Sequence, residues 1–237
     1  MLEQRPVSNT MTNEPHYDCP ICQDHGYIIT RNDDDPLHDI YTECECAKKK
    51  RALQILKSSG LEAQSKKCTL DNFIADSDRA KNLLDHARQY LEDEAKWFFV
   101  SGVPGSGKTH ICTALAVELI HRGNYVYYAR WREIIVKLKM LLSNDYYEYQ
   151  GLMNSLKKAD VLYLDDFFKG SVTDADISHA FELLDYRYLQ PDCRTIISTE
   201  YSMPELREID DAIARRIFER AKGYCCASPD RNYSFTR

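Results

Sequence analysis

The chain has 237 residues, of which 43% are hydrophobic and 29% are charged, and its formal net charge is −6. This length and apolar fraction suffice for one full α/β domain with a small appendage, and they exclude wholesale disorder. No apolar run approaches the roughly 20 residues of a membrane-spanning helix, and the N-terminus lacks a basic flank followed by an apolar stretch. We therefore expect a cytoplasmic protein with no membrane partner.

The charge is distributed unevenly along the chain. Residues 1–46 carry a net charge of −8, residues 47–68 carry +6 and residues 69–237 carry −4. Such a profile predicts regions with different partners. We expect a disordered leader at 1–16, a zinc-binding module at 17–46, a basic linker or helix at 47–68 and a larger domain at 69–237.

Four of the nine cysteines lie near the N-terminus, as Cys-x2-Cys followed by Cys-x-Cys. Because nothing in the sequence indicates an oxidising compartment, these pairs indicate thiolate metal ligands rather than disulfides. Four thiolates form a closed tetrahedral set that suits structural Zn²⁺. The predicted ligands are Cys19, Cys22, Cys44 and Cys46, and His25 or His38 is an alternative to one of them.

The segment between the two cysteine pairs predicts a β-hairpin. Residues 27–30 and 39–42 have the composition of short strands, and they flank the polar turn NDDDP. Pro20 and Gly26 favour a tight turn that directs backbone N–H groups at sulfur. After the second pair, leucines spaced among lysines predict a basic helix that ends near Gly60.

From residue 69 the pattern becomes a regular alternation of helices and short apolar strands. This alternation predicts an α/β fold, in which a parallel sheet carries helices on both faces. The predicted strands are 97–100, 125–129, 161–166 and 195–199, and the predicted helices are 77–94, 110–122, 131–144 and 177–189.

The sequence GVPGSGKT at 102–109 matches the G-x-x-x-x-G-K-[ST] phosphate-binding loop, with a predicted strand before it and a predicted helix after it. Glycines let backbone N–H groups close around phosphates, Lys108 reaches the β- and γ-phosphates, and the Thr109 hydroxyl binds Mg²⁺. The predicted nucleotide-binding residues are Gly102, Pro104, Gly105, Ser106, Gly107, Lys108, Thr109 and His110.

The predicted strand at 161–166 ends in two carboxylates, at the sheet edge where ligands bind in this type of fold. We expect Asp165 to hold Mg²⁺ and Asp166 to polarise the water that attacks the γ-phosphate. Both roles suit phosphoryl transfer, which requires mainly positioning and charge neutralisation.

With GVPGSGKTH, VLYLDDF, TIISTEYSMPEL and IDDAIARRIFER in this order, residues 68–222 resemble the helicase-loader branch of the AAA+ ATPases. This branch comprises the DnaC and DnaI proteins and their phage relatives, with the transposition helper IstB close by. The N-terminal CPIC…CEC module followed by a basic stretch resembles the zinc-bearing region of Gram-positive and phage loaders. The resemblance implies an AAA+ core with little or no C-terminal lid, and an ATP-dependent loader of a hexameric DnaB-type helicase on single-stranded DNA.

The resemblance also implies roles for single residues. Arg216 matches the arginine finger, which reaches the γ-phosphate of a neighbouring subunit, so hydrolysis would be slow and would depend on a self-oligomer; Arg215 is adjacent to it. The family often has Asn at the end of the fourth strand, where Thr199 is the predicted sensor in this chain. A second sensor would be Arg231 or Arg237.

Cations and aromatic residues are interleaved between the second and third predicted strands, a pattern that suits single-stranded DNA, although the tyrosines also suit a core or an interface. The candidates are Arg132, Lys137, Lys139 and Tyr146. The acidic cysteine module predicts a protein partner, which in the family is the helicase. Two other functions stay open: an IstB-like transposition helper that binds duplex DNA and a transposase, and a nucleotide-gated adaptor with negligible hydrolysis.

Overall fold

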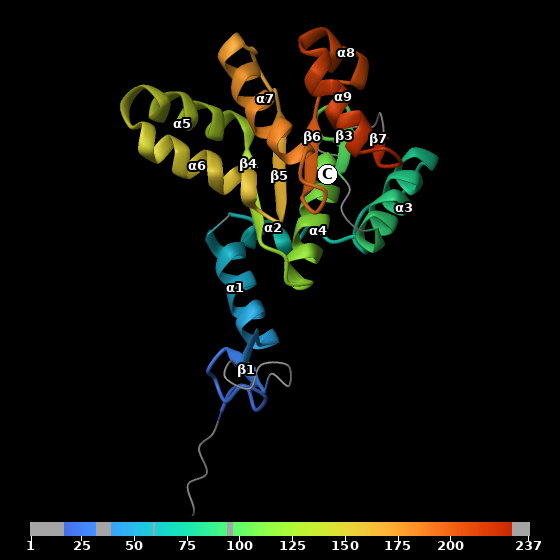
Figure 1. The fold of residues 1–237 in the computed structure, drawn as a ribbon. Helices are drawn as coiled ribbons and strands as arrows, with labels where there is room; N and C mark the ends of the chain where they lie inside the picture. Colours follow the sequence, from blue (N-terminus) through green and yellow to red (C-terminus); the bar gives the residue numbers. More distant parts are fainter. Residues whose placement is uncertain (1–16, 32–38, 59, 94–96, 229–237) are drawn as a thin grey trace, which may run out of the picture. The chain divides into compact units, whose positions relative to one another are not determined.

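The structure is a computed structural model that describes residues 17–31, 39–58, 60–93 and 97–228 (Figure 1). The chain divides into two compact units, Met1–Lys50 and Arg51–Arg237. We call them the cysteine unit and the sheet unit and describe each by itself. Some sequence predictions lie outside the described residues, namely the leader at 1–16, His38, Arg231 and Arg237.

The cysteine unit contains the predicted hairpin. Its strands β1 (Tyr27–Thr30) and β2 (Ile40–Glu43) pair antiparallel, with Tyr27 opposite Glu43, which confirms the prediction. Helix α1 (Glu45–Ser58) begins two residues before the predicted linker, so Cys46 lies in its first turn. Among the described residues of this unit, only Cys19, Cys22 and Cys44 are buried.

The sheet unit is built on five parallel strands in the order β4-β5-β6-β3-β7. Four of the strands confirm the predicted ones to within one residue, and the fifth, β7, was not predicted. The strands are β3 (Trp97–Ser101), β4 (Val126–Arg130), β5 (Val161–Phe167), β6 (Arg194–Thr199) and β7 (Cys225–Ala227).

Eight helices are described in the sheet unit beyond α1. Four of them match predicted helices, whereas α6 falls on a segment in which no helix was predicted. They are α2 (Glu62–Ser65), α3 (Asp78–Glu92), α4 (Lys108–His121), α5 (Trp131–Asn144), α6 (Tyr146–Lys158), α7 (Asp174–Tyr188), α8 (Met203–Ile209) and α9 (Asp211–Arg220).

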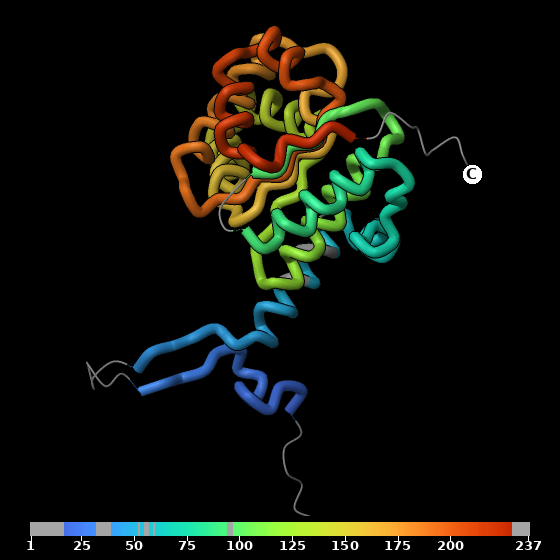
Figure 2. The backbone as a smooth tube through the Cα atoms, turned by 90° about the vertical axis from the view of Figure 1, so that its right-hand side faces the viewer, coloured from blue at the N-terminus to red at the C-terminus, as the bar shows by residue number. Residues whose placement is uncertain are grey.

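The helices form a layer on each face of the sheet, as predicted (Figure 2). Successive strand residues point to opposite faces, so Phe98 and Val100 pack with α3 and α4, whereas Trp97 and Phe99 pack with α5, α6, α7 and α9. All four of these side chains are buried. Strands that are apolar on both faces are typical of a parallel sheet covered on both sides.

Polar side chains set where the helices begin. The Ser77 hydroxyl accepts a hydrogen bond from the Ala80 N–H at the start of α3, and Asp145, the residue between α5 and α6, accepts one from the Glu148 N–H. After α9 the described part of the chain contains the strand β7 and no further helix. None of the described helices has the length and apolar composition to span a membrane.

Candidate nucleotide site and metal centre

The phosphate-binding loop connects β3 to α4, as the sequence predicts. Gly107, the residue before α4, has a φ of +90°, and a Cβ there would lie 3.0 Å from the Phe73 ring, so glycine is needed. The first backbone N–H groups of α4 have no acceptors within the helix and carry the positive end of its dipole. The loop is therefore shaped to bind an anion such as a phosphate.

Lys108 is buried in this loop. Its ammonium group donates hydrogen bonds to the carbonyl oxygens of Gly102 at 2.7 Å and Val103 at 2.8 Å. Burial lowers the pKa of Lys108, against the opposing effect of Glu200 and Asp166. An ammonium group bound to neutral carbonyls gains from an anionic acceptor, so Lys108 is placed to turn to a phosphate.

Asp165, at the end of β5, is buried and accepts hydrogen bonds on both carboxylate oxygens. Its Oδ1 accepts from Thr109 Oγ1 at 3.3 Å, Tyr163 OH at 2.9 Å and Ser198 Oγ at 2.6 Å. Its Oδ2 accepts from Tyr128 OH at 3.1 Å, and burial together with the Asp165 charge raises the pKa of Tyr128 to about 12. The Thr109 hydroxyl and the Asp165 carboxylate are thus neighbouring oxygen donors of the kind that Mg²⁺ prefers.

Asp166 is aimed differently from Asp165 because the strand is irregular at this point. The register of β5 against β6 shifts between Leu164 and Phe167, and Asp166 has a φ of +54°. Its N–H donates to Ser198 Oγ at 3.0 Å, and its half-exposed carboxylate lies 3.1 Å from Lys169 Nζ. The two carboxylates therefore have separate surroundings, one buried and hydrogen-bonded, the other accessible and ion-paired.

A cavity of about 300 Å³ lies over the loop and the end of β5. It contains most of the predicted nucleotide-binding residues, while Gly102 and the fully buried Ser106 do not line it. Lys169 and Glu200, which pair at 3.0 Å, were not predicted. The lining residues are Pro104, Gly105, Gly107, Lys108, Thr109, His110, Asp166, Lys169 and Glu200.

Thr199, the predicted sensor, does not reach this cavity. It is fully buried, its hydroxyl donates to the Phe167 carbonyl oxygen at 2.8 Å, and it accepts from the Tyr201 N–H at 3.2 Å. The residue at the end of β6 that lines the cavity is Glu200, and Ser198 is the one that contacts both aspartates. Because successive side chains along a strand point to opposite faces, Thr199 faces away from the cavity that Glu200 lines, and its sensor role stays a prediction.

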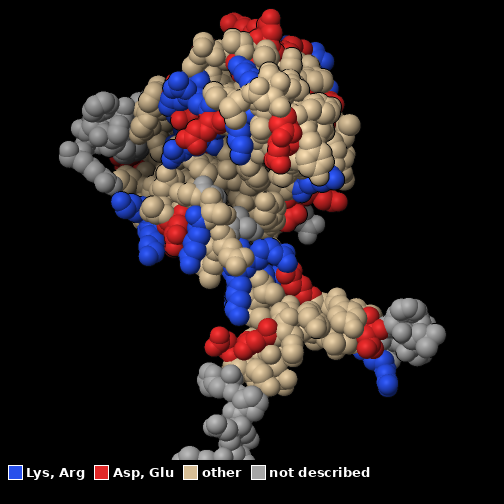
Figure 3. Space-filling view, turned by 90° about the vertical axis from the view of Figure 1, so that its left-hand side faces the viewer, with Lys and Arg blue, Asp and Glu red and all other residues tan. Residues whose placement is uncertain are grey.

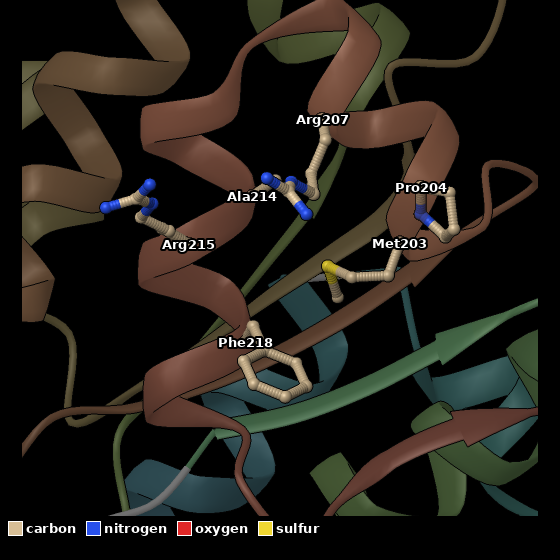
Figure 4. A pocket seen from close by; sticks show the side chains of 6 residues that line it. All are labelled: Met203, Pro204, Arg207, Ala214, Arg215 and Phe218. Carbon is tan, nitrogen blue, oxygen red and sulfur yellow. The ribbon is translucent and has the colours of Figure 1, made fainter.

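Arg216, the predicted finger, is bound within its own chain. Its guanidinium lies 2.7 Å from the Asp185 carboxylate and 4.6 Å from the centre of the Phe181 ring. Arg215 is more exposed, pairs with Asp211 at 3.2 Å and lines a second, apolar cavity of about 340 Å³ between α8 and α9 (Figure 4). Neither arginine lines the nucleotide cavity of its own chain.

The segment before α3 covers one side of the phosphate-binding loop. The carbonyl oxygen of Thr69 lies 2.9 Å from His110 Nε2, and the buried Phe73 ring meets the His110 ring edge-on with centroids 5.4 Å apart. The contacts of Phe73 with His110 and Gly107 were not predicted. The signal that was available is Phe73 in TLDNF, an aromatic residue shortly before the predicted helix at 77–94.

The four predicted zinc ligands meet in the cysteine unit, with all sulfur atoms within 4.8 Å of one another. Cys19 and Cys44 have their sulfur atoms 3.8 Å apart, and those of Cys22 and Cys46 lie 3.3 Å apart. Zinc with Zn–S bonds of about 2.3 Å places its sulfur ligands about 3.8 Å apart in a tetrahedron. The spacing therefore fits Zn²⁺, and His25 is exposed and does not belong to the cluster.

The surroundings of the sulfur atoms also fit a metal site. The Gly26 N–H points at Cys22 Sγ at 3.4 Å, as the predicted tight turn requires. The hydrogen bond with the Cys22 side chain raises the pKa of Cys46 to about 12, and burial adds to this effect. A divalent cation reverses this effect, because it stabilises all four thiolates together.

The four candidate DNA contacts lie on α5 and α6. Arg132 and Lys137 are exposed, whereas Lys139 pairs with Asp176 at 2.5 Å. Tyr146 is 64% exposed and its ring stacks on Tyr149 with centroids 6.0 Å apart. Figure 3 shows acidic side chains among the basic ones on this side of the sheet unit, so the surface is not uniformly positive.

A family profile described as "IstB-like ATP binding protein" matches residues 37–229. The chain belongs to the family of IstB-like ATP-binding proteins. Two Bacillus subtilis (strain 168) proteins are similar to it over most of their length: "Uncharacterized protein YqaM" and the phage-like element PBSX protein XkdC. YqaM is 27% identical over 259 residues, covering 88% of this chain and 81% of YqaM; XkdC is 29% identical over 241 residues, covering 94% and 86%.

This IstB-like protein is also similar to the replicative helicase loader DnaC of Escherichia coli (strain K12). The identity is 31% over 111 residues, which cover 46% of this chain and 45% of the loader. A crystal structure of the DnaC helicase loader superposes with a TM-score of 0.62 at 21% identity, over 70% of this chain and 99% of that one. A DnaI crystal structure gives a TM-score of 0.57 at 20% identity, over 70% and 89%.

The structural likeness shows the fold, and it confirms the predicted AAA+ P-loop core in this IstB-like protein. Family and fold together make the chain an ATP-binding protein of the ATPase class, with the resemblance to the DnaC and DnaI loaders confirmed.

Proposed function

We propose that this protein is an ATP-dependent loader that places a hexameric DnaB-type replicative helicase on single-stranded DNA. One observation carries the proposal: a complete phosphate-binding loop and the Thr109–Asp165 pair meet at one cavity, in a chain that is 31% identical to a helicase loader over 111 residues. The loader match spans less than half of each protein, so the proposal needs its own test.

In the proposed site, residues of the chain bind the phosphate groups of the nucleotide. The backbone N–H groups of the loop and the Lys108 ammonium bind the β- and γ-phosphates. Thr109 and Asp165 hold Mg²⁺, which neutralises charge on the phosphate oxygens when bound. The hydrogen bonds from Ser198, Tyr163 and Tyr128 fix the Asp165 carboxylate in one orientation, so that little reorganisation is needed on binding.

Asp166 is the carboxylate that orients the attacking water in this proposal. Its ion pair with Lys169 at 3.1 Å competes with a water molecule for the same carboxylate, and Lys169 is itself shared with Glu200. This arrangement supports slow hydrolysis. It also gives the alternative, a nucleotide-gated adaptor, a specific structural basis, because a carboxylate kept in this pair would not catalyse.

Arg216 acts in trans in this proposal, on ATP bound to the next subunit of an oligomer. The arginine must exchange Asp185 for a phosphate oxygen, and the exchange is feasible because its side chain retains 24% exposure. An arginine that stabilises charge in the transition state contributes about 10³–10⁵ in rate in comparable enzymes. Hydrolysis would then depend on assembly.

The cysteine unit, with Zn²⁺ on Cys19, Cys22, Cys44 and Cys46, is the proposed docking part for the helicase. Residues 1–46 carry a net charge of −8, and four thiolates on Zn²⁺ leave a further formal −2, which disfavours binding to DNA phosphates. Single-stranded DNA is assigned instead to α5 and the start of α6, where Arg132, Lys137 and Tyr146 are exposed.

The catalytic assignments are tested by measuring ATP turnover of the wild type, Asp166→Asn and Arg216→Ala, each with single-stranded DNA. We expect both variants to lose turnover, and Arg215→Ala, a neighbour on the same helix, to retain it. Mixing the two inactive variants should restore part of the rate, because some junctions then combine an intact Asp166 with an intact Arg216. Equal rates in all proteins would refute the catalytic roles, and a negligible rate in the wild type would favour the adaptor.

The loader function is tested by mixing the protein with ATP, a DnaB-type hexamer and circular single-stranded DNA, and measuring how much helicase becomes DNA-bound. We expect an ATP-dependent increase that Lys108→Ala abolishes. The alternative function, an IstB-like transposition helper, is supported by the description of the family. Binding to duplex DNA and a transposase, without any effect on helicase loading, would replace our proposal with that function.

A further inference from the structure

Ser228, the residue that follows β7, contacts Ser106 of the phosphate-binding loop. Its N–H donates to the Ser101 carbonyl oxygen at 2.7 Å, and its Oγ lies 2.6 Å from the Oγ of Ser106 in the loop. Ser106 is fully buried and Ser228 is 2% exposed. Neither residue lines the nucleotide cavity.

The direction of this hydrogen bond follows from the number of protons available. The Ser106 hydroxyl donates to the Val103 carbonyl oxygen at 2.7 Å, and a hydroxyl has a single proton to donate. The bond between the two serines must therefore run from Ser228 to Ser106. A chain of hydrogen bonds results, from Ser228 through Ser106 to the Val103 carbonyl.

The Val103 carbonyl is also one of the two acceptors that hold Lys108, at 2.8 Å. When Lys108 turns to a phosphate, this carbonyl loses its cation and keeps two donors from Ser106, the hydroxyl at 2.7 Å and the backbone N–H at 3.4 Å. Ser106 then supplies both remaining donors to Val103, so the shape of the loop at this carbonyl depends on Ser106 staying in place. Packing adds to the constraint, because a Cβ at Gly102 would overlap Ser228 Oγ.

We propose that Ser228 is a positioning residue for ATP binding: through Ser106 it holds the loop in its phosphate-accepting shape while Lys108 changes partners. It does not contact the phosphates itself. The inference rests on the proposed function in one respect, that ATP is the ligand of the loop. Ser228, at the end of β7, would thus contribute to the affinity for the nucleotide.

The test measures the dissociation constant of MgATP and the steady-state rate for Ser228→Ala in the full chain. We expect affinity to fall about five- to tenfold, the usual effect of one buried hydrogen bond, and the KM to rise with it. The rate at saturating ATP should stay unchanged, since Ser228 touches no reacting atom. Ser228→Cys, which keeps the volume and a weak donor, should give an intermediate affinity.

A double-mutant cycle decides whether Ser228 acts through Ser106. In a Ser106→Ala background, Ser228→Ala should have no further effect on affinity. The control is Thr195→Val, which removes a fully buried hydroxyl that accepts from Arg187 Nε at 3.0 Å. This control should lower the melting temperature and leave MgATP affinity at the wild-type value.

The outcomes separate this inference from the proposed function. A Ser228→Ala protein that melts earlier but binds MgATP as the wild type does would overturn the positioning role alone. Additive effects of the two serine variants would overturn the route through Ser106. A wild-type protein that does not bind MgATP would overturn the proposed function together with this inference.

Discussion

The two units of the chain are stabilised in different ways. The sheet unit buries an apolar core on each face of its sheet, with large side chains such as Trp97 and Phe98 fully buried. The described residues of the cysteine unit bury three cysteines and no aliphatic or aromatic side chain. Segments of about 40 residues or fewer usually need a metal or disulfides to fold. Burial of apolar side chains therefore stabilises the sheet unit, whereas we expect the cysteine unit to depend on a metal ion that joins its sulfur atoms.

The largest expected effect is the unfolding of the cysteine unit alone. Cys44→Ser, or removal of the metal with a chelator, should unfold it, because structural zinc contributes on the order of 10 kcal/mol to folding in small zinc domains. Zinc content and limited proteolysis check the result, and MgATP binding by the sheet unit should persist.

The control for this variant is Cys225→Ser, which changes an exposed cysteine of β7 outside the cluster. It should keep the full zinc content. A Cys44→Ser protein with an intact, protease-resistant N-terminal unit would show that the sulfur cluster is not what holds this unit together.

The next largest effect is a loss of stability in the sheet unit alone. Arg187 is fully buried, and its guanidinium donates to the carbonyl oxygens of Leu156, Lys157, Ala159 and Arg194. Arg187→Met should lower the free energy of unfolding of the sheet unit by about 4 kcal/mol, since it leaves buried carbonyls without donors. Chemical denaturation measures this value, while zinc content should not change.

The matched control is Arg207→Met on α8, where an exposed arginine pairs with Asp211 at 2.9 Å. An exposed ion pair contributes about 0–1 kcal/mol, so this variant should unfold almost as the wild type does. Equal losses in the two variants would contradict the special role of the buried arginine.

The contrast between the units also explains what the sequence could predict. Short motifs with their own chemistry, such as the four cysteines and the loop ending in Lys108 and Thr109, are local and were predictable. The apolar runs that became β3 to β6 were predictable for the same reason. Strand β7 was missed because CCA has no strand-like composition, and its place is set by pairing with β3.

Helix α6 and the end of β6 show two other limits. YYEY has a strand-like, aromatic composition, yet Tyr149, Met153 and Leu156 recur at helical spacing and are buried, a signal that was available. Which residue at the end of β6 faces the cavity, Thr199 or Glu200, depends on the orientation of the side chains there. The register shift before Phe167 and the positive φ of Asp166 come from tertiary packing, so no alternation pattern in the sequence reveals them.

A smaller effect is expected on MgATP binding, from a variant in which both units stay folded. Lys108→Ala should weaken MgATP binding about a hundredfold, because it removes the ammonium group that is placed to meet the phosphates. Binding is measured by calorimetry, with zinc content on the same sample. Lys158→Ala, which removes an exposed lysine at the end of α6, is the control and should bind normally. Full affinity in the Lys108→Ala protein would refute the nucleotide site.

The smallest effect concerns the response of the sheet unit to acid. Asp176, in the first turn of α7, is buried, accepts from the Thr173 N–H at 2.8 Å and pairs with Lys139 at 2.5 Å. Burial alone raises the pKa of Asp176, but the hydrogen bonds from Lys139 and Thr173 outweigh it and lower the pKa below its usual value. A carboxyl whose pKa is lowered by folding stabilises the fold above its unfolded pKa, and this contribution is lost as the pH falls through the folded value.

Asp176→Asn should therefore lower the free energy of unfolding by about 1 kcal/mol at pH 7, and the difference from the wild type should shrink below pH 4. Urea titrations at pH 7, 5 and 3 measure it. Asp174→Asn changes an exposed acid in the same helical turn, so it keeps the contact with Lys139 and should cost less. A difference between Asp176→Asn and the wild type that stays constant down to pH 3 would mean that the cap geometry, and not the ionised carboxylate, supplies the stability.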